Sequence, residues 1–190
     1  MTFRRPPLPH AAALSLTLAA CVGVTSCAPK PGAPAAGPSI NTDANMIGIA
    51  DSNAKMQNPS QGAKFAVTNI RVGSHNGFDR VVFDLSGTGN PGWRAEYTRD
   101  ATELGSGHSI HCTCPQALTI DIDGTVAPYL VGASDPHLDK VPGIGGVTEI
   151  ITAGTEPGRS QFVIGLGGQT PYSVDMLENP ARVVVDITKK

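Results

Sequence analysis

The heptapeptide from His108 to Cys114 holds a dense group of reactive side chains, with two imidazoles and two thiols. Imidazole and thiolate are ligands that suit zinc and copper. On an extended strand His108, Cys112 and Cys114 would point to one side and His111 to the other, so a closed metal site would need a loop here. Exported proteins tend to oxidise neighbouring thiols, which favours a Cys112–Cys114 disulfide. A disulfide, ordinary loop residues and a metal site formed by these four side chains all remain open.

A second pair of cysteines, Cys21 and Cys27, lies near the start of the chain and predicts lipid attachment. Arg4 and Arg5 precede an apolar stretch that is too short to span a bilayer and is typical of a signal peptide. The residues Leu-Ala-Ala before Cys21 are similar to a bacterial lipobox, and Val-Thr-Ser before Cys27 fits the same pattern. Leucine favours Cys21, whereas an even number of remaining cysteines favours Cys27. We expect a lipoprotein signal peptide over residues 1–26, or 1–20, with a palmitate-type acyl group on the cysteine that follows.

Residues 27–63 predict a tether between this anchor and a folded domain. Residues 28–38 are rich in Pro, Ala and Gly, and residues 41–61 are rich in Asn, Ser, Asp and Gln. Such segments cannot bury enough apolar surface to offset the entropy cost of ordering them. We therefore expect a disordered linker that holds the domain on the extracytoplasmic side of the cell membrane, lipid-anchored.

The amino-acid composition indicates which class of protein domain the folded part belongs to. Only 16% of the 190 residues are charged, the formal net charge is -2, and the chain has 22 Gly and 16 Pro. A weakly charged chain gives no electrostatic footprint for nucleic acid, so we expect no nucleic-acid partner. Frequent Gly and Pro are typical of a turn-rich extracytoplasmic β domain. No segment carries a cofactor motif, and we expect no cofactor.

The elements that must position the reactive residues are short strands within residues 64–190. Strand-like runs cover residues 65–71, 80–85, 94–98, 118–122, 147–152, 160–166, 172–177 and 182–188. Short strands separated by turn residues predict an all-β fold, a β-sandwich. The hexapeptide RVVFDL at residues 80–85 returns as RVVVDI at residues 182–187, which suggests one domain built from two similar, related sheets.

Each copy of this hexapeptide carries an arginine and an aspartate on the same face of its strand. These charges favour a structural role, in which each pair bridges to a neighbouring strand or to its counterpart and holds the strand register. The alternative is a ligand surface in which Arg80, with Trp93, Arg94 and Tyr97, binds glycan or peptide carboxylates. Arginine suits bidentate binding of carboxylates, and a tryptophan after a turn can stack on a sugar ring or fill a core.

Two longer motifs surround these hexapeptides. The first is VTNIRVG at residues 67–73 followed by GFDRVVFDL at residues 77–85, and the second is PYSVDMLENPARVVVDI at residues 171–187. Both motifs resemble the AMIN domain, the N-terminal module of cell-wall amidases. With PGWRAEY at residues 91–97, the chain more narrowly resembles the AMIN-like domain of actinobacterial lipoproteins. The resemblance implies a β-sandwich of two similar sheets that attaches proteins to the envelope, with peptidoglycan as the usual proposed ligand.

The sequence matches known catalytic motifs more weakly than it matches the AMIN motifs. No serine lies in a nucleophile elbow, and the glycine-rich turn at residues 142–146 lacks the Lys-Ser/Thr of a phosphate loop. We therefore expect no enzyme activity, but a cell-envelope lipoprotein whose domain binds cell-wall glycan or scaffolds envelope proteins. The alternative is a metal-binding or redox lipoprotein that uses His108, His111, Cys112 and Cys114.

Overall fold

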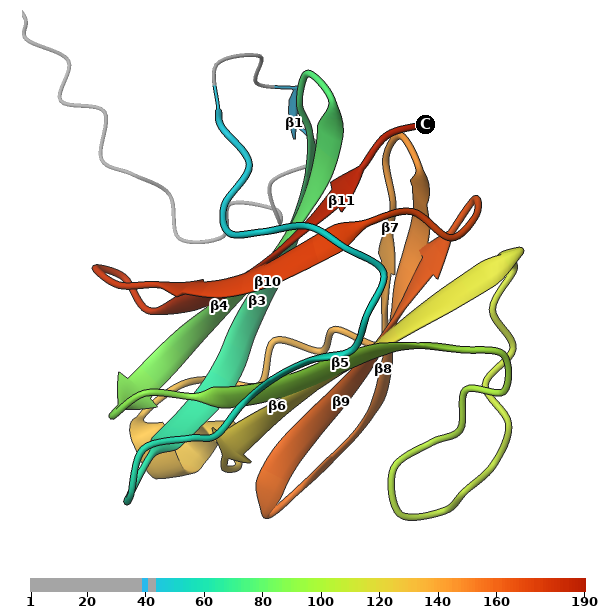
Figure 1. Cartoon of the computed structure of the whole chain (residues 1–190). Coiled ribbons are helices and arrows are strands. Elements are labelled where there is room, and N and C mark those ends of the chain that lie inside the picture. The colour runs from blue at the N-terminus through green and yellow to red at the C-terminus, as the bar shows by residue number, and fades with distance from the viewer. Residues whose placement is uncertain (1–38, 41–43) are drawn as a thin grey trace, which may run out of the picture. The chain divides into compact units, whose positions relative to one another are not determined.

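Alternating apolar and polar residues form strands along most of the chain that the computed structural model describes, residues 39–40 and 44–190 (Figure 1). The elements are β1 (Ser39–Ile40), β2 (Lys55–Gln57), β3 (Lys64–Ser74), β4 (Phe78–Thr88), β5 (Gly92–Thr98), β6 (Gln116–Thr125), the 3-10 helix η1 (Pro128–Val131), β7 (Lys140–Pro142), β8 (Val147–Glu156), β9 (Gly158–Leu166), β10 (Tyr172–Leu177) and β11 (Arg182–Thr188). The prediction of an all-β fold is confirmed.

The strands form two layers that are joined at one corner. The first layer has the order β10-β11-β4-β3, and the second has the order β2-β5-β6-β9-β8-β7. The layers connect through a single parallel pair between β3 and β6, Phe65 with Thr125. There the backbone N–H of Val126 donates to the carbonyl of Phe65 (2.7 Å). The predicted sandwich is therefore present, with its two sheets continuous through this corner.

One hydrophobic core fills the space between the layers. Strand alternation places Val81, Phe83 and Leu85 of β4 in this core, and the equivalent positions of β11 face the same way. The rings of Phe83 and Phe162 meet across the two layers with centroids 4.8 Å apart. Burying each such side chain stabilises the fold by about 1.5–3 kcal/mol, so this shared core is what holds the layers together.

The two copies of the hexapeptide are neighbours in the first layer, not markers of two separate sheets. Strands β4 and β11 pair antiparallel, with Arg80 opposite Asp186 and Arg182 opposite Asp84. Antiparallel pairing of two Arg-x-x-x-Asp strands places opposite charges across from each other at both ends of the pair. The repeat therefore marks two paired strands of one sheet, not one strand in each of the two sheets.

Residues 44–57, which we call the strap, lie against the sandwich. The backbone of Asp51 pairs with that of Tyr172 in β10, and β2 then pairs antiparallel with β5 (Figure 1). Residues 44–57, which fall within the tether predicted for residues 27–63, are therefore held against the folded domain. Backbone hydrogen bonds fix the strap, and a composition rich in Asn, Ser and Gln gives no signal for such bonds.

Several predictions fall on residues 1–38 and 41–43, which lie outside the described residues. These are the signal peptide over 1–26 or 1–20, the lipidated Cys21 or Cys27, and most of the tether between residue 27 and residue 43. Among the described residues, no helix has the length and apolar character needed to cross a membrane.

Candidate functional site

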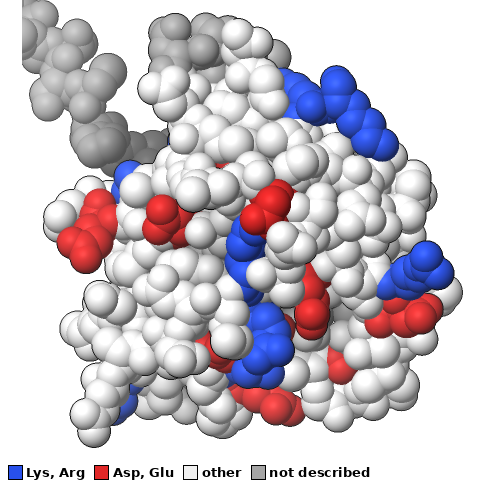
Figure 2. Space-filling view, in the orientation of Figure 1, with Lys and Arg blue, Asp and Glu red and all other residues white. Residues whose placement is uncertain are grey.

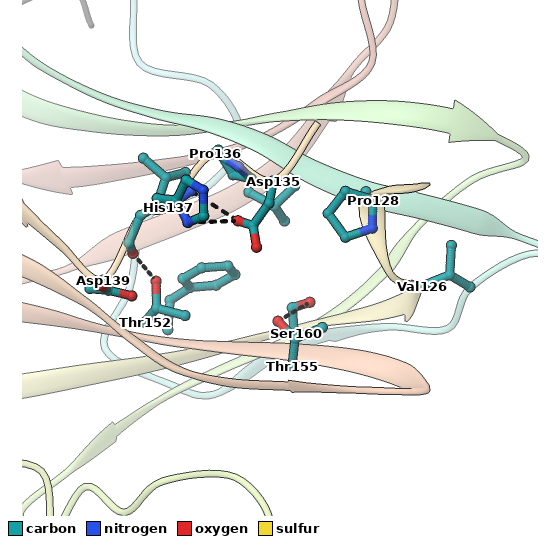
Figure 3. Close-up of a pocket in the computed structure, with 13 residues that line it drawn as sticks. Val126, Pro128, Asp135, Pro136, His137, Asp139, Thr152, Thr155 and Ser160 are labelled. Carbon is teal, nitrogen blue, oxygen red and sulfur yellow. Dashed lines mark hydrogen bonds and ion pairs between the residues drawn. The ribbon is translucent and has the colours of Figure 1, made fainter. Parts of the chain in front are cut away.

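A cavity of about 250 Å³ opens beside the corner where the two layers join (Figure 3). It is bounded by β3, by η1, by the loop that precedes β7, and by β8 and β9, and we call it the η1 pocket. Its lining residues are Ala66, Val67, Val126, Pro128, Asp135, Pro136, His137, Leu138, Asp139, Thr152, Thr155, Ser160 and Phe162. The volume lies just below the range of about 300–1,000 Å³ typical of small-molecule sites, so it suits one compact group.

The floor of the η1 pocket is apolar and rigid. Ala66 of β3 and Phe162 of β9 are 2% and 3% exposed, and Phe162 belongs to the main core. Val67 of β3, another lining residue, also belongs to the main core. Because the floor is part of the core, the pocket is formed in advance of any ligand.

Hydroxyl groups line the wall that β8 and β9 provide. The Thr155 and Ser160 hydroxyl oxygens lie 3.1 Å apart, and Ser160 in turn donates to the Thr125 hydroxyl (3.0 Å). Thr152 donates its hydroxyl to the carbonyl of Leu138, which fixes the loop before β7 against β8. The wall therefore offers hydroxyl groups in a fixed order along two paired strands.

Asp135 and His137 form the opposite rim of the pocket. The backbone N–H of His137 donates to Asp135 Oδ1 (2.9 Å), and His137 Nδ1 lies 3.8 Å from the same oxygen (Figure 3). His137 has φ of 49°, a left-handed conformation that a non-glycine residue rarely adopts. The aspartate thus stabilises an unusual backbone turn that places both side chains at the mouth of the pocket.

The charge of the η1 pocket is acidic. Asp135 and Asp139 are exposed at its rim, and the thirteen lining residues include neither lysine nor arginine. On the face drawn in Figure 2, acidic and basic side chains are interspersed over a mostly uncharged surface. Carboxylates accept hydrogen bonds from hydroxyl or ammonium groups, whereas they repel phosphates and carboxylates. The pocket is built for neutral or cationic groups.

Next to the pocket, η1 presents apolar side chains to solvent. Tyr129 is 77% exposed and Leu130 is 61% exposed, and both directly follow the lining residue Pro128. An exposed tyrosine offers a flat apolar face together with a polar hydroxyl, which suits contact with a sugar ring or with a partner's surface.

Arg80, the first predicted ligand-binding residue, is engaged inside the protein. Its Nε and Nη2 donate to the Asp186 carboxylate at 2.6 and 2.8 Å, and Nη2 also donates to the carbonyl of Asn45 in the strap (2.8 Å). The Arg80 side chain is 16% exposed and that of Asp186 is 1% exposed. The Arg80 guanidinium therefore links β4, β11 and the strap, which is the charge-bridging role predicted for the hexapeptide.

The other three predicted ligand residues all lie on β5, but they do not share a surface. Trp93 is buried in the core, Arg94 on the opposite face is exposed, and the hydroxyl of the half-buried Tyr97 donates to the carbonyl of Thr170 (2.6 Å). Alternation along β5 forces this separation. The stacking surface predicted for Trp93 is therefore absent, and the structure does not bring these residues together with Arg80.

The cysteines of the His108–Cys114 cluster are joined to each other by a disulfide. His108 lies 3.7 Å from Glu103, and His111 is exposed. Among the described residues, no group of three or more His, Cys, Asp or Glu side chains is arranged to hold a metal ion. A disulfide also removes the thiolates that the metal reading requires.

Sequence reasoning missed the residues that line the η1 pocket. Asp135, His137 and Asp139 fall in one short polar run before β7, and that spacing was the available signal. The hydroxyl wall comes from strands that looked ordinary, because alternation alone does not show which positions border a cavity.

Comparison with known proteins identifies one relationship. The family model of the AMIN-like domain matches residues 65–189, about two thirds of the chain. The matched stretch contains the whole η1 pocket and both hexapeptides, whereas the strap lies before it. No curated protein and no solved structure matches the chain.

Proposed function

The chain belongs to the AMIN-like domain family, and we propose that it binds the glycan of the cell wall in the η1 pocket. AMIN-like domains have a cell-wall-related, non-catalytic role in general. The observation that carries the proposal is a preformed cavity lined by carboxylates and hydroxyls and free of lysine and arginine. Wall glycan presents many hydroxyl groups, and these are the partners that such a lining is able to bind.

Recognition in this proposal uses two polar walls over an apolar floor. Asp135 and Asp139 accept hydrogen bonds from sugar hydroxyls, and charged acceptors make such bonds shorter and stronger than neutral ones do. Thr155 and Ser160, on the facing strands, lie where one sugar ring would bridge the walls. Phe162 below supplies apolar contact for the ring's C–H face.

Tyr129 extends the site beyond the pocket. Its exposed ring stands next to Pro128, so a glycan chain with one unit in the cavity would place a neighbouring unit near the tyrosine. Contact between an aromatic ring and a sugar adds apolar burial without any need for a deep cleft.

Anchoring of the chain by lipid on Cys21 or Cys27 is a separate part of the proposal. It rests on the sequence pattern alone: a short apolar stretch that ends in two lipobox-like tetrapeptides. A lipidated cysteine with two or three acyl chains anchors stably, and the segment after it leaves the domain within reach of the wall. Labelling of cells with a radioactive fatty acid should mark the chain. One of the two substitutions Cys21→Ser and Cys27→Ser should abolish the label, and that result would identify the lipidated cysteine.

Sedimentation with purified cell-wall sacculi tests the binding function. A soluble fragment of residues 44–190, which includes the strap and the whole core, should sediment with sacculi. The double substitution Asp135→Asn and Asp139→Asn should weaken binding by about tenfold, as expected for the loss of two charged hydrogen-bond acceptors.

Matched controls make this result specific. Asp100→Asn changes an exposed aspartate outside the pocket, and Arg94→Ala changes the exposed residue of the earlier predicted site. Both variants should sediment like the unchanged fragment. Failure of the fragment to sediment, or equal sedimentation of all variants, would contradict glycan binding in the η1 pocket and favour a purely protein-scaffolding role.

A further inference from the structure

The Cys112–Cys114 disulfide lies in an ordered loop between β5 and β6, residues 99–115, away from the η1 pocket. The loop is held by backbone hydrogen bonds, among them Ile110 N–H to the Ala101 carbonyl (2.8 Å) and Leu104 N–H to the Ala153 carbonyl (2.6 Å). Both cysteines are half-buried, and the residues His111, Thr113 and Pro115 that flank them are exposed. Solvent therefore reaches the bond in the folded protein.

This disulfide closes too small a loop to serve mainly as a staple. The bonded cysteines are only two positions apart in the sequence. In the chain-entropy account, stabilisation by a cross-link increases with the number of residues in the closed loop, and here that number is close to its minimum. The loop is also fixed by its own backbone bonds, so the disulfide needs another explanation.

Gly165 of β9 and Glu149 of β8, both in the second layer, support the disulfide loop, and we call these two residues together with Lys140 the seat. A Cβ placed on Gly165 of β9 would lie 2.7 Å from Cys112 Sγ and 3.1 Å from Cys114 Cβ, so the disulfide rests directly on the backbone of that strand. Between the two cysteines, the Thr113 N–H donates to the Glu149 carboxylate (2.6 Å). Glycine at residue 165 thus leaves the room, and Glu149 fixes the ring from below.

Lys140 completes this seat with a positive charge. Its ammonium group pairs with the same Glu149 carboxylate that binds Thr113. Burial alone would raise the pKa of Glu149, but Lys140 and the Thr113 amide lower it below its usual value, so the carboxylate stays ionised. A fixed ion pair therefore lies under the peptide unit that links the two sulfurs.

We propose that Cys112–Cys114 is a thiol–disulfide exchange centre that accepts electrons from protein dithiols. A substrate thiolate attacks one cysteine sulfur, the S–S bond breaks, and the other cysteine leaves as a thiolate. The second substrate thiolate then attacks the substrate sulfur of the mixed disulfide. The substrate gains a disulfide, and the chain keeps two cysteine thiols that hold the two electrons and the two protons released by the substrate.

The seat favours both directions of this exchange. The ammonium of Lys140 neutralises the Glu149 carboxylate under the loop, so this carboxylate does not repel a leaving thiolate, and a leaving thiolate of lower pKa departs faster. The hydrogen bond from Thr113 to Glu149 does not involve the sulfurs, so it keeps Cys112 and Cys114 close together after reduction. A second, oxidised thiol compound can then restore the bond without unfolding the loop.

Exchange with glutathione tests the proposal on the full chain. The substitutions Cys21→Ser and Cys27→Ser leave Cys112 and Cys114 as the sole cysteines. The folded chain is incubated with excess reduced glutathione, quenched with acid, alkylated and weighed by mass spectrometry. We expect the native disulfide to open at a rate within about tenfold of that in the urea-unfolded chain, because it is accessible. Protection by about a hundredfold or more would overturn the proposal.

A charge variant tests the seat. Lys140→Gln should slow the opening by about threefold or more, because the Glu149 carboxylate then loses its counter-charge and repels the leaving thiolate. Lys64→Gln, at an exposed lysine of β3, is the matched control and should leave the rate unchanged. Equal rates in the two variants would contradict the role of Lys140. A reduced chain that fails to re-form its disulfide with oxidised glutathione would overturn the exchange function itself.

Discussion

The two hexapeptide copies face each other across β4 and β11, yet their charges end in different states. Arg80 and Asp186 form a buried, two-pronged pair that the strap covers: the Ile47 N–H donates to Asp186 Oδ2 (2.7 Å). Across the other end of the same strands, Arg182 is opposite Asp84, but its Nη1 donates to the carbonyl of Pro180 (2.9 Å). Of the two Arg–Asp pairs that face each other across these near-identical strands, Arg80–Asp186 is joined by hydrogen bonds, whereas Arg182 bonds elsewhere.

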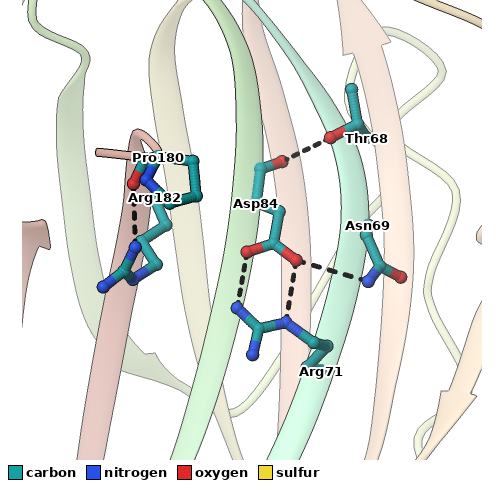
Figure 4. Close-up of polar contacts among 6 residues, drawn as sticks. All are labelled: Thr68, Asn69, Arg71, Asp84, Pro180 and Arg182. Atoms are coloured by element: carbon teal, nitrogen blue, oxygen red, sulfur yellow. Dashed lines mark hydrogen bonds and ion pairs between the residues drawn. The ribbon is translucent and has the colours of Figure 1, made fainter. Parts of the chain in front are cut away.

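A third strand explains the difference. Arg71 of β3 donates from Nε and Nη2 to the Asp84 carboxylate at 2.8 and 2.6 Å, and Asn69 adds a bond of 3.3 Å (Figure 4). Strand β3 flanks β4 on the side away from β11, so Arg71 competes with Arg182 for the Asp84 carboxylate. Cross-strand charge pairing thus depends on every neighbour of a strand, not only on the partner that repeats its sequence.

The comparison also separates the residues that stabilise the fold from those that we propose bind a ligand. One arginine of the repeat and both of its aspartates are engaged in ion pairs, so little of the repeat is free for a ligand. The η1 pocket, by contrast, has carboxylates and hydroxyls around an open cavity. The charged repeat is therefore distinct from the cavity that we propose binds the wall.

The largest expected effect comes from Asp186→Asn. It leaves the Arg80 guanidinium without its counter-charge in a place where both side chains are nearly buried. Breaking a buried pair from one side costs about 3–5 kcal/mol of the free energy of unfolding. Urea unfolding followed by circular dichroism measures this loss, and a loss no greater than that of Asp84→Asn would contradict the difference between the pairs.

Release of the strap should have the next largest effect. Ser173 is 2% exposed and donates its hydroxyl to the carbonyl of Ile47, beside the Ile47 N–H that binds Asp186. Ser173→Ala should cost about 1–1.5 kcal/mol, the usual value of a buried hydrogen bond. Limited proteolysis should then cut within residues 44–57 more readily than in the unchanged protein. Unchanged proteolysis would indicate that the strap does not depend on this contact.

Asp84→Asn should cost less, about 0.5–1 kcal/mol, because its partner Arg71 is 44% exposed. Solvent and salt screen such a pair, whereas the Arg80–Asp186 pair is protected. Raising NaCl to about 1 M should therefore shrink the cost of Asp84→Asn and leave that of Asp186→Asn nearly unchanged. Equal salt dependence of the two costs would show that burial does not distinguish the pairs.

The smallest effect is expected for Arg182→Ala, below about 0.5 kcal/mol, because the side chain makes one bond to a backbone carbonyl. A double-mutant cycle sharpens the point. With Arg71→Ala already present, Asp84 is released and Arg182 is the arginine opposite it, so Arg182→Ala should then cost more. Strict additivity of the two substitutions would rule out competition for Asp84.

Much of the fold was readable from the sequence, since alternation gave the all-β class and the Arg–Asp motif gave its charge-bridging role. The pairing of Asp84 with Arg71 instead of Arg182 was not, because it depends on which strand flanks β4, a long-range fact. The strap escaped notice because backbone groups hold it. The η1 pocket combines five separate elements, so no local pattern marks Asp135 and Ser160 as neighbours of one cavity.

The central claim is that the family's charged repeat builds the sandwich and the η1 pocket binds the glycan. Titration of the ¹⁵N-labelled fragment 44–190 with a soluble N-acetylated disaccharide of wall glycan, followed by NMR, tests it residue by residue. Amides of residues 135–139 and 152–160 should shift in a saturable way, while those of residues 80–85 and 182–187 stay in place. Shifts confined to the two hexapeptides, or none at all, would contradict it.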